Sequence, residues 1–233
     1  MKLSSSLSGL INILGYEFGN SELLVEALTH RSVGAKNYER LEFLGDSILN
    51  FVIADQLFTR YPQYPEGDLS RLRASLVNKD SLAKIAKILN LGEYLILGSG
   101  ELKSGGFRRD SILADTVEAL IGAVYVDGGF ELSRELVLHL YEELLGDVPD
   151  PATLKDPKTR LQELLQSRKL SLPVYEVTDI SGKAHSQTFV VTCSINELDI
   201  ESHGKANSRR KAEQKAAIEA IAAAELKINL SNK

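Results

Sequence analysis

The spacing of apolar residues changes abruptly at a proline-containing segment, and this change limits the possible folds more than any other feature of the sequence. Up to residue 147, apolar residues recur three and four positions apart, as they do in amphipathic helices. The sequence GDVPDPATLKDP at the change holds three of the chain's six prolines, which indicates a linker at 148–155. We therefore expect an all-α domain in residues 1–147.

The pattern beyond the linker is that of a small α+β domain in residues 156–226, followed by a tail at 227–233. An amphipathic helical segment comes first. Three segments rich in β-branched and aromatic residues follow, with turn residues between them. A strongly helical segment, SRRKAEQKAAIEAIAAAEL, ends the domain. The order α-β-β-β-α predicts two helices packed on one face of an antiparallel sheet.

Composition narrows the class of protein further. The chain is 43% hydrophobic and 25% charged, as folded proteins are. A lone cysteine, Cys193, excludes an intrachain disulfide and a cysteine-based zinc site. The N-terminus is a poor signal peptide, and the sequence has no apolar run of about 18 residues. We therefore expect a cytoplasmic protein without a membrane span.

The net charge of −5 hides a difference between the two parts of the chain. Residues 1–154 contain 14 Lys and Arg against 22 Asp and Glu, a net charge of −8. Residues 155–225 contain 11 Lys and Arg against 10 Asp and Glu, a net charge of +1. An acidic first part and a weakly basic second part indicate different tasks.

Two segments of the first domain, 39–58 and 112–129, are apolar enough to lie in its core, yet each carries a stripe of acids. Helical spacings of three and four keep the acids of each segment on one face. These acids are Glu39, Glu42 and Asp46 in the first segment and Asp115 and Glu118 in the second. Like charges at such spacings destabilise a helix, and unpaired buried carboxylates are costly. A group outside each helix must therefore balance them.

A divalent cation would balance these acids if the two stripes face each other. Carboxylate oxygens in such number suit Mg²⁺ or Mn²⁺, and no cluster of His or Cys competes. The alternative is that each acid pairs with a neighbouring arginine, such as Arg40, Arg108 or Arg109. Because two acid pairs occur on the two most apolar segments, we favour the metal site. Three further acids fall in predicted loops, where helix caps and solvated groups are common: Glu66, Asp68 and Asp110.

Four segments of the first domain carry a resemblance to the ribonuclease III endonucleases. ERLEFLGDS (39–47) is similar to the signature of that family, and three other characteristic blocks match in the same order. These blocks are LTHRS (28–32), EGDLSRLRASLV (66–77) and LKSGGFRRDSILADTVEALIGAVYVDGG (102–129). The second domain resembles the double-stranded RNA-binding domain that follows the nuclease domain in bacterial members.

The resemblance implies a Mg²⁺-dependent endoribonuclease, with Mn²⁺ as a substitute ion. Such an enzyme works as a homodimer and hydrolyses phosphodiester bonds on both strands of double-stranded RNA. It leaves staggered ends with 5′-phosphates and 3′-hydroxyls. Precursors of ribosomal RNA are the family's usual substrates, and other structured transcripts, including messenger and transfer RNA, are processed too. We expect the same partners here: double-stranded RNA and a second copy of the chain.

The resemblance also assigns roles to single residues. The family's metal-binding acids fall on the four positions that the helix argument selects: Glu42, Asp46, Asp115 and Glu118. Asp46 and Glu118 are implied as the acids most essential for turnover. Glu39 and Glu66 are implied as outer acids near the RNA or a second metal ion. Phe43 is implied as a dimer contact, for which the alternative is a plain core residue.

A cluster of cations opens the last helix of the second domain: Arg209, Arg210 and Lys211, with Lys215 one turn on. Cations there oppose the helix dipole, so this placement costs stability unless an anion is bound. A helix N-terminus with adjacent cations is a good phosphate site. A solvated basic turn is the alternative, and we favour phosphate binding.

The resemblance implies two further RNA contacts in the second domain. His185, in the loop SGKAHSQTF (181–189), would enter a minor groove of the duplex, although Lys183 stands where the family often has proline. The first helix of the domain would contact 2′-hydroxyls and base edges in a second minor groove. The residues for that contact are Thr159, Gln162 and Glu163. Such domains read the A-form shape over about 16 base pairs.

Two other functions stay open on sequence grounds. A double-stranded RNA-binding protein that keeps the fold but does not cleave is disfavoured by the complete acid set. A metal-dependent phosphatase or nucleotide hydrolase is disfavoured by the attached RNA-binding-like domain. Cleavage assays on long duplex RNA, with small phosphate esters as the comparison, separate these functions.

Overall fold

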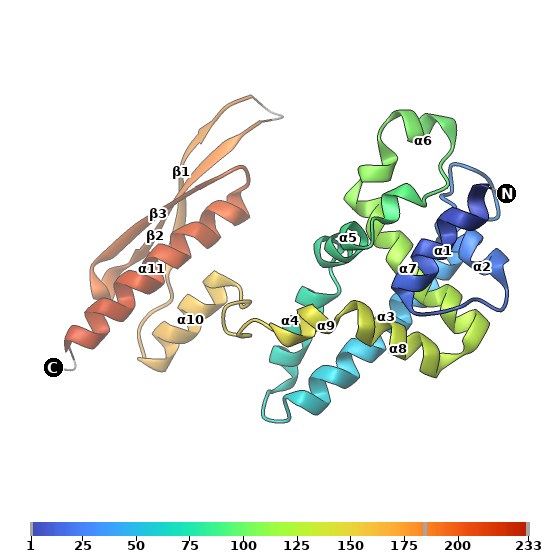
Figure 1. Cartoon of the computed structure of the whole chain (residues 1–233). Helices are drawn as coiled ribbons and strands as arrows, with labels where there is room; N and C mark the ends of the chain where they lie inside the picture. Colours follow the sequence, from blue (N-terminus) through green and yellow to red (C-terminus); the bar gives the residue numbers. More distant parts are fainter. Residues whose placement is uncertain (1, 184–185, 232–233) are drawn as a thin grey trace. The chain divides into compact units, whose positions relative to one another are not determined.

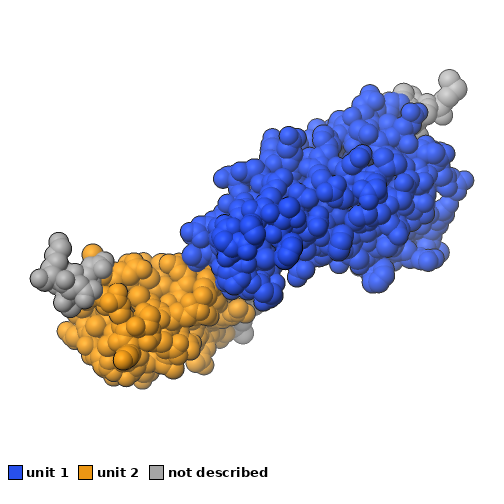
Figure 2. Space-filling model, turned by 90° about the horizontal axis from the view of Figure 1, so that it is seen from below, with its two compact units in different colours: residues 1–154 blue, residues 155–233 orange. Residues whose placement is uncertain are grey.

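The chain folds into two compact units, residues 1–154 and residues 155–233, which Figure 2 shows in different colours. The structure is a computed structural model that describes residues 2–183 and 186–231. Each unit has its own hydrophobic core. None of the helices in the described ranges combines the length and apolar character that crossing a bilayer requires.

The first unit is helical, which confirms the predicted all-α class (Figure 1). Short 3-10 turns, η1 and η2, lie between its α-helices. In chain order the elements are α1 (Lys2–Leu14), α2 (Ser21–Leu28), α3 (Glu39–Arg60), α4 (Glu66–Leu76), α5 (Lys79–Ile88), η1 (Leu91–Glu93), α6 (Ser99–Lys103), η2 (Gly106–Arg108), α7 (Asp110–Gly128), α8 (Phe130–Leu140) and α9 (Glu142–Gly146).

Helices α3 and α7 form the centre of the first unit. Leu49 and Ile53 on α3 and Leu120 and Ile121 on α7 are fully buried. Both helices belong to one core, against which the surrounding helices pack. The apolar content of the two segments therefore does place them in the interior.

The two central helices approach each other most closely at a pair of glycines. A Cβ atom on Gly45 of α3 would lie 1.8 Å from the carbonyl oxygen of Glu118, and one on Gly122 of α7 would lie 2.2 Å from the carbonyl oxygen of Leu41. Any side chain at either position would strike the backbone of the opposite helix. Glycine therefore allows the separation at which α3 and α7 pack.

Two helices of the first unit begin at acids for which the sequence predicts loops. Glu66 opens α4 and Asp110 opens α7, and Asp68 stands in the first turn of α4. Pro65 precedes α4 in an extended conformation, with φ −67° and ψ 160°. Acids in a first helical turn interact favourably with the helix dipole, which explains why they start helices here.

Apolar residues keep helical spacing throughout 131–145, yet this stretch forms parts of two helices, α8 and α9. The break is at Tyr141, whose backbone has φ −102° and ψ 7°. Tyr141 is fully buried, and Leu145 is 4% exposed. The helical spacing of apolar residues continues through the break, so the sequence pattern gives no sign of it.

The second unit has the predicted α-β-β-β-α order (Figure 1). Its elements are α10 (Pro157–Ser167), β1 (Val174–Ser181), β2 (Thr188–Ile195), η3 (Asn196–Leu198), β3 (Ile200–Ala206) and α11 (Arg209–Ser231). Asp156 caps α10, because its side chain accepts a hydrogen bond from the backbone N–H of Lys158, and Pro157 takes the first helical position.

The three strands form an antiparallel sheet in the order β1-β2-β3. Val191 at the centre of β2 faces Val177 on β1 and Gly204 on β3. A Cβ atom on Gly204 would lie 2.0 Å from the carbonyl oxygen of Ala212, so α11 lies directly against β3. Figure 1 shows α11 along the sheet with α10 beside it.

Helix α11 continues to Ser231, through most of the stretch that the sequence assigns to a tail. Ile228 lies within the core of the unit at 9% exposure. The ammonium of Lys227 donates hydrogen bonds to the carbonyl oxygens of Leu198 and Asp199, at 2.6 and 2.7 Å. These contacts hold the last turns of the helix against the turn before β3.

Candidate active site

Helices α3 and α7 bring three carboxylates together. Glu42, Asp115 and Glu118 each place one oxygen within 4.8 Å of the others, and we call these three residues the acid cluster. All three side chains are half-buried. Mg²⁺ binds oxygen at about 2.0–2.1 Å, so two ligands of one ion lie at most about 4.2 Å apart. Small side-chain rotations would therefore place all three oxygens around one ion.

Asp46 lies at the edge of the acid cluster rather than within it. Its side chain is exposed, and its Oδ1 accepts a hydrogen bond of 2.8 Å from the amide of Asn50. Its charge nevertheless acts on Glu118. Of the four acids selected from the sequence, the structure thus brings three into contact distance and leaves the fourth one helical turn away from Glu42, facing solvent.

Burial and mutual repulsion oppose full ionisation of the acid cluster. Burial raises the pKa of Glu118 to about 8, and the charges of Asp46, Glu42 and Asp115 add to the effect. Burial and the charge of Asp115 also raise the pKa of Glu42. Crowded carboxylates of this kind bind either protons or a metal ion. The set of oxygen donors and its electrostatics both fit a hard divalent cation.

Lysine, not arginine, forms the ion pair at the acid cluster. The ammonium of Lys79, at the start of α5, lies 3.4 Å from Oδ1 of Asp115. Arg109 pairs with Glu101 at 2.8 Å, and Arg108 lies over the ring of Phe107. Within residues 2–183, neither of these arginines nor Arg40 forms an ion pair with the cluster. Among the described residues, pairing with arginine is therefore not what balances the three acids of the cluster.

The two outer acids stand apart from the acid cluster. Glu39 is exposed, and its Oε1 lies 3.5 Å from the guanidinium of Arg31. Glu66, at the start of α4, accepts a hydrogen bond of 2.6 Å from the hydroxyl of Ser70. The charge of Glu39 adds to the raised pKa of Glu42.

Several residues that shape the site escape the sequence analysis. Gly45 and Gly122 permit the close approach of the two helices. The only trace of this in the sequence is a small residue among large apolar ones. Lys79 lies on another helix, so no spacing links it to Asp115. The hydroxyl of Tyr141 is buried without a hydrogen-bond partner in the described structure. Burial and the charge of Glu118 raise the pKa of this tyrosine, which places it in the electrostatic surroundings of the site.

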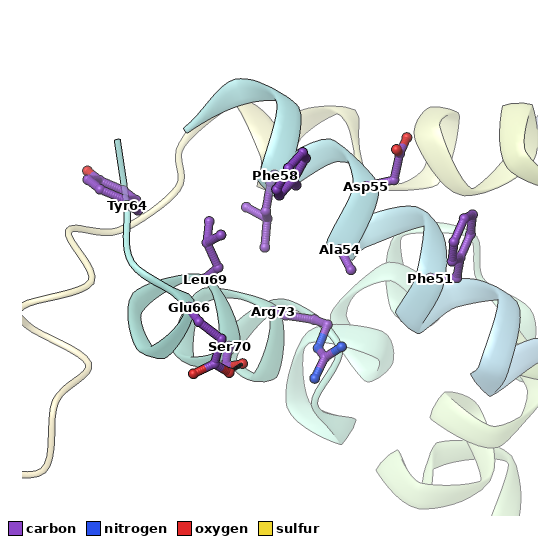
Figure 3. Close-up of a pocket in the computed structure, with 10 residues that line it drawn as sticks. Phe51, Ala54, Asp55, Phe58, Tyr64, Glu66, Leu69, Ser70 and Arg73 are labelled. Atoms are coloured by element: carbon purple, nitrogen blue, oxygen red, sulfur yellow. Dashed lines mark hydrogen bonds between the residues drawn. The ribbon is translucent and has the colours of Figure 1, made fainter. Parts of the chain in front are cut away.

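A second feature of α3 is a row of aromatic side chains that the unit does not cover. Phe43 is 78% exposed, Phe51 59% and Phe58 72%. The exposure of Phe43 rules out the alternative of a plain core residue. A groove of about 530 Å³ runs beside the row, lined by Phe51 and Phe58 of α3, by residues of α4 and by Tyr64 between these helices (Figure 3).

The residues expected to contact RNA on α10 are exposed. Thr159 and Gln162 lie on the outer face of the helix, and Glu163 forms an ion pair with Lys155. His185 lies outside the described residues. The surface of α10 is therefore free to meet a ligand, although Glu163 already has a cationic partner.

The cations at the start of α11 differ in their surroundings. Arg209 forms an ion pair of 2.8 Å with Glu213, which also pairs with Lys158. Burial would raise the pKa of Glu213, but the hydrogen bonds from these two cations outweigh burial and lower it. Arg210 is 82% exposed and lies 3.8 Å from Asp156. Lys215 is exposed and has no ion pair in the described structure.

The sequence matches two known families in succession. Residues 20–144 match a family described as Ribonuclease-III-like, and residues 157–223 match the double-stranded RNA binding motif. The first match covers most of the helical unit, including α3 and α7. The second covers α10, the sheet and the first part of α11 in the second unit.

Curated relatives match over nearly the whole chain. A protein named Ribonuclease 3 from Vibrio cholerae serotype O1 is 55% identical over 219 residues, which cover 94% of this chain and 97% of the relative. A protein of the same name from Alkalilimnicola ehrlichii is 60% identical over 204 residues, which cover 88% of this chain and 90% of the relative. The similarity thus spans both units.

Solved structures of a nuclease domain also match the chain at more than 40% identity. The nuclease domain of ribonuclease III from Campylobacter jejuni is 44% identical with a TM-score of 0.58, covering 61% of this chain and 97% of that one. Another structure of this domain, described as flexible in the region involved in dimer formation, is 46% identical with a TM-score of 0.57, covering 58% and 95%.

Proposed function

This chain belongs to the ribonuclease III family and is an endoribonuclease of double-stranded RNA, and we propose that Mg²⁺ held by its acid cluster supports the cleavage. The observation that carries the proposal is the meeting of three carboxylate oxygens within 4.8 Å, on two helices that glycines hold close together. The raised pKa of Glu118, at about 8, supports a site that needs a cation. Mn²⁺, which prefers similar ligands, would serve as a substitute.

Cleavage adds water across a phosphodiester bond of the RNA. The water oxygen bonds to phosphorus while the bond to the 3′ oxygen breaks, and the leaving oxygen takes up a proton. The products are a 5′-phosphate and a 3′-hydroxyl. When bound, the ion lowers the pKa of water and offsets negative charge on the leaving oxygen. This chemistry needs no Ser, Cys or His nucleophile.

The four acids would divide the work. Glu42, Asp115 and Glu118 would hold the ion, because their oxygens already lie within one small volume. Asp46 would be the fourth ligand, at the edge of the cluster, and would help orient the attacking water, because its carboxylate faces solvent and accepts a hydrogen bond from Asn50. Asp46 and Glu118 would be the acids most essential to turnover. Two outer acids would act near the RNA or a second ion, namely Glu39 and Glu66.

The working form in this proposal is a homodimer in which each copy cuts one strand. The row formed by Phe43, Phe51 and Phe58 supports it, because exposed aromatic side chains beside an apolar groove are typical of a protein interface. A second copy would cover this surface around a two-fold axis, the commonest symmetry of oligomers. A structural relative is described as having a region involved in dimer formation.

The second unit binds double-stranded RNA, and the proposed contacts lie on its two helices and one loop. Phosphates would meet Arg210 and Lys215, which are exposed at the start of α11, with Arg209 beside them. Minor-groove contacts would come from α10 and from His185. The proposed α10 contacts are Thr159, Gln162 and Glu163.

The proposal also covers organisation and substrates. Cleavage and dimerisation belong to 1–147 and RNA binding to 156–226, joined by a linker at 148–155. Precursors of ribosomal RNA and other structured transcripts would be the substrates. The enzyme would act in the cytoplasm, where thiols stay reduced, and the buried, unpaired thiol of Cys193 is compatible with this.

A metal-depletion experiment tests the proposed function. Protein freed of metal with EDTA should not cleave a long RNA duplex, and added Mg²⁺ or Mn²⁺ should restore cleavage. Small phosphate esters, offered under the same conditions, should not be hydrolysed. Cleavage that persists in the metal-free protein would contradict the proposed use of Mg²⁺.

A further inference from the structure

Lys79 is the single cation that pairs with the acid cluster within the described ranges 2–183 and 186–231. It is the first residue of α5, where the side chain of Asn78 caps the helix by accepting a hydrogen bond from the backbone of Ser81. Its ammonium lies 3.4 Å from Asp115. The lysine side chain is 69% exposed and that of Asp115 only 18%, so an exposed cation reaches a largely buried carboxylate.

We propose that Lys79 competes with the divalent ion for Asp115, and so sets the metal concentration that the enzyme requires. The inference rests on the proposed metal site. In the metal-free protein the ammonium occupies one side of Asp115. When the ion binds, the lysine must move away, because two cations would otherwise crowd one carboxylate.

Charge and geometry both support displacement rather than coexistence. A divalent ion on the acid cluster would carry twice the charge of the ammonium and would bind the same carboxylate of Asp115 that the ammonium contacts. An exposed lysine on a flexible stem can swing into solvent at little cost. Its charge also lowers the pKa of Glu118 and of Glu42, so its influence reaches the whole cluster.

The exposure of Lys79 limits the size of the effect. Exposed ion pairs contribute little free energy, and the competition should shift metal affinity by roughly two- to fivefold. Lys79 would therefore tune metal binding without blocking it.

Metal binding to the RNA-free protein tests the proposal independently of cleavage. Calorimetric titration with Mg²⁺ at alkaline pH, which favours the ionised carboxylates, should show roughly two- to fivefold tighter binding for Lys79→Gln than for the unchanged protein. Lys79→Arg keeps the charge and should bind as the unchanged protein does. Lys84→Gln removes an exposed lysine from the same helix and serves as the matched control. The Mg²⁺ concentration for half-maximal cleavage should fall by the same factor in Lys79→Gln alone.

Unchanged or weaker Mg²⁺ binding by Lys79→Gln would overturn the proposal. Asp115→Asn distinguishes this result from failure of the proposed function. If the acid cluster is not the metal site, Asp115→Asn binds Mg²⁺ as well as the unchanged protein does. If only the competition is absent, Asp115→Asn loses binding while Lys79→Gln keeps the unchanged affinity. Thermal unfolding in EDTA establishes that each variant is folded before titration.

Discussion

A Cβ atom on Gly45 would stand 1.8 Å from the carbonyl oxygen of Glu118, so the backbones of α3 and α7 touch where the acids gather. Gly122 makes the reciprocal contact, with the carbonyl oxygen of Leu41 at 2.2 Å from its Cβ position. The separation of the two helices fixes the distance between the carboxylates that they carry. The helix contact and the acid cluster are therefore one structural feature.

Gly45→Ala should separate the helices and damage stability and cleavage together. The opposing atom is backbone and cannot rotate away, so we expect a loss of about 3 kcal/mol or more in the free energy of unfolding. Urea unfolding measures this loss. Gly146→Ala, at the end of α9 with no atom within 4 Å of its Cβ position, is the control and should change stability little. A Gly45→Ala protein as stable as the unchanged one would show that the helices can part freely.

Glu118→Gln should abolish cleavage but leave RNA binding nearly unchanged. The substitution removes a negative charge from the acid cluster, whereas the second unit still binds the duplex. Replacing a residue that only supports a metal ligand lowers activity by up to about 100-fold. Replacing a ligand itself should therefore lower cleavage by more than that. Asp46→Asn should have the same effect, and Glu131→Gln, an exposed acid on α8, should have none. Gel-shift and cleavage assays on one duplex provide the comparison, and parallel losses in both would count against the assignment.

Helical periodicity was sufficient to predict which acids share a face, because side chains three and four residues apart must project together. It predicted the fold class for the same reason, since the spacing of apolar residues differs between helices and strands. It did not predict how deep each acid lies. Glu118 and Asp46 look equivalent in sequence, yet only Asp46 faces solvent.

Contacts between distant segments escape any reading of local pattern. Lys79 and Asp115 are 36 residues apart, and only the packing of α5 beside α7 brings them together. The exposure of Phe43 has a related cause. The spacing of apolar residues along α3 does not distinguish a residue that packs within the chain from one that stays exposed, as Phe43 does.

The stability of the metal-free protein should fall as the pH rises from about 5 to 8. Glu118 has an ordinary pKa of 4.5 and a raised one of about 8 in the folded state, so between these values the folded protein holds a proton that the unfolded chain has released. The loss is at most about 1.4 kcal/mol per pH unit. Glu42, whose pKa is also raised, adds in the same direction. Urea unfolding in EDTA at several pH values should show this decrease in the free energy of unfolding. The decrease should be smaller when Mg²⁺ replaces EDTA and in Glu118→Gln. An equal decrease in Glu118→Gln would mean that other groups cause it.

Phe43→Asp should convert the proposed dimer into monomers. A charge within the proposed apolar interface would be buried without a partner, which opposes association. Sedimentation velocity at micromolar concentration should show the mass of one chain for this variant and of two for the unchanged protein. Leu102→Asp changes a 54% exposed apolar residue on α6, away from the aromatic row, and should leave the mass at that of two chains. If Phe43→Asp still sediments as a dimer, the aromatic row is not the interface.

Lys215→Ala should weaken the binding of duplex RNA and make it less sensitive to salt. Lys215 is exposed on α11 without an ion pair in the described part of the chain, so its charge is available to a phosphate. Loss of one phosphate contact should lower the slope of log affinity against log salt concentration by somewhat less than about 1. Lys205→Ala is the control, because Lys205 alternates with the buried residues of β3 and so faces away from α11. Binding measured from 50 to 300 mM salt distinguishes the two variants, and an unaltered slope for Lys215→Ala would show that this lysine does not contact RNA.

Arg209→Ala should act differently, since Arg209 pairs with the buried Glu213 and its loss should lower the stability of the second unit as well as RNA affinity.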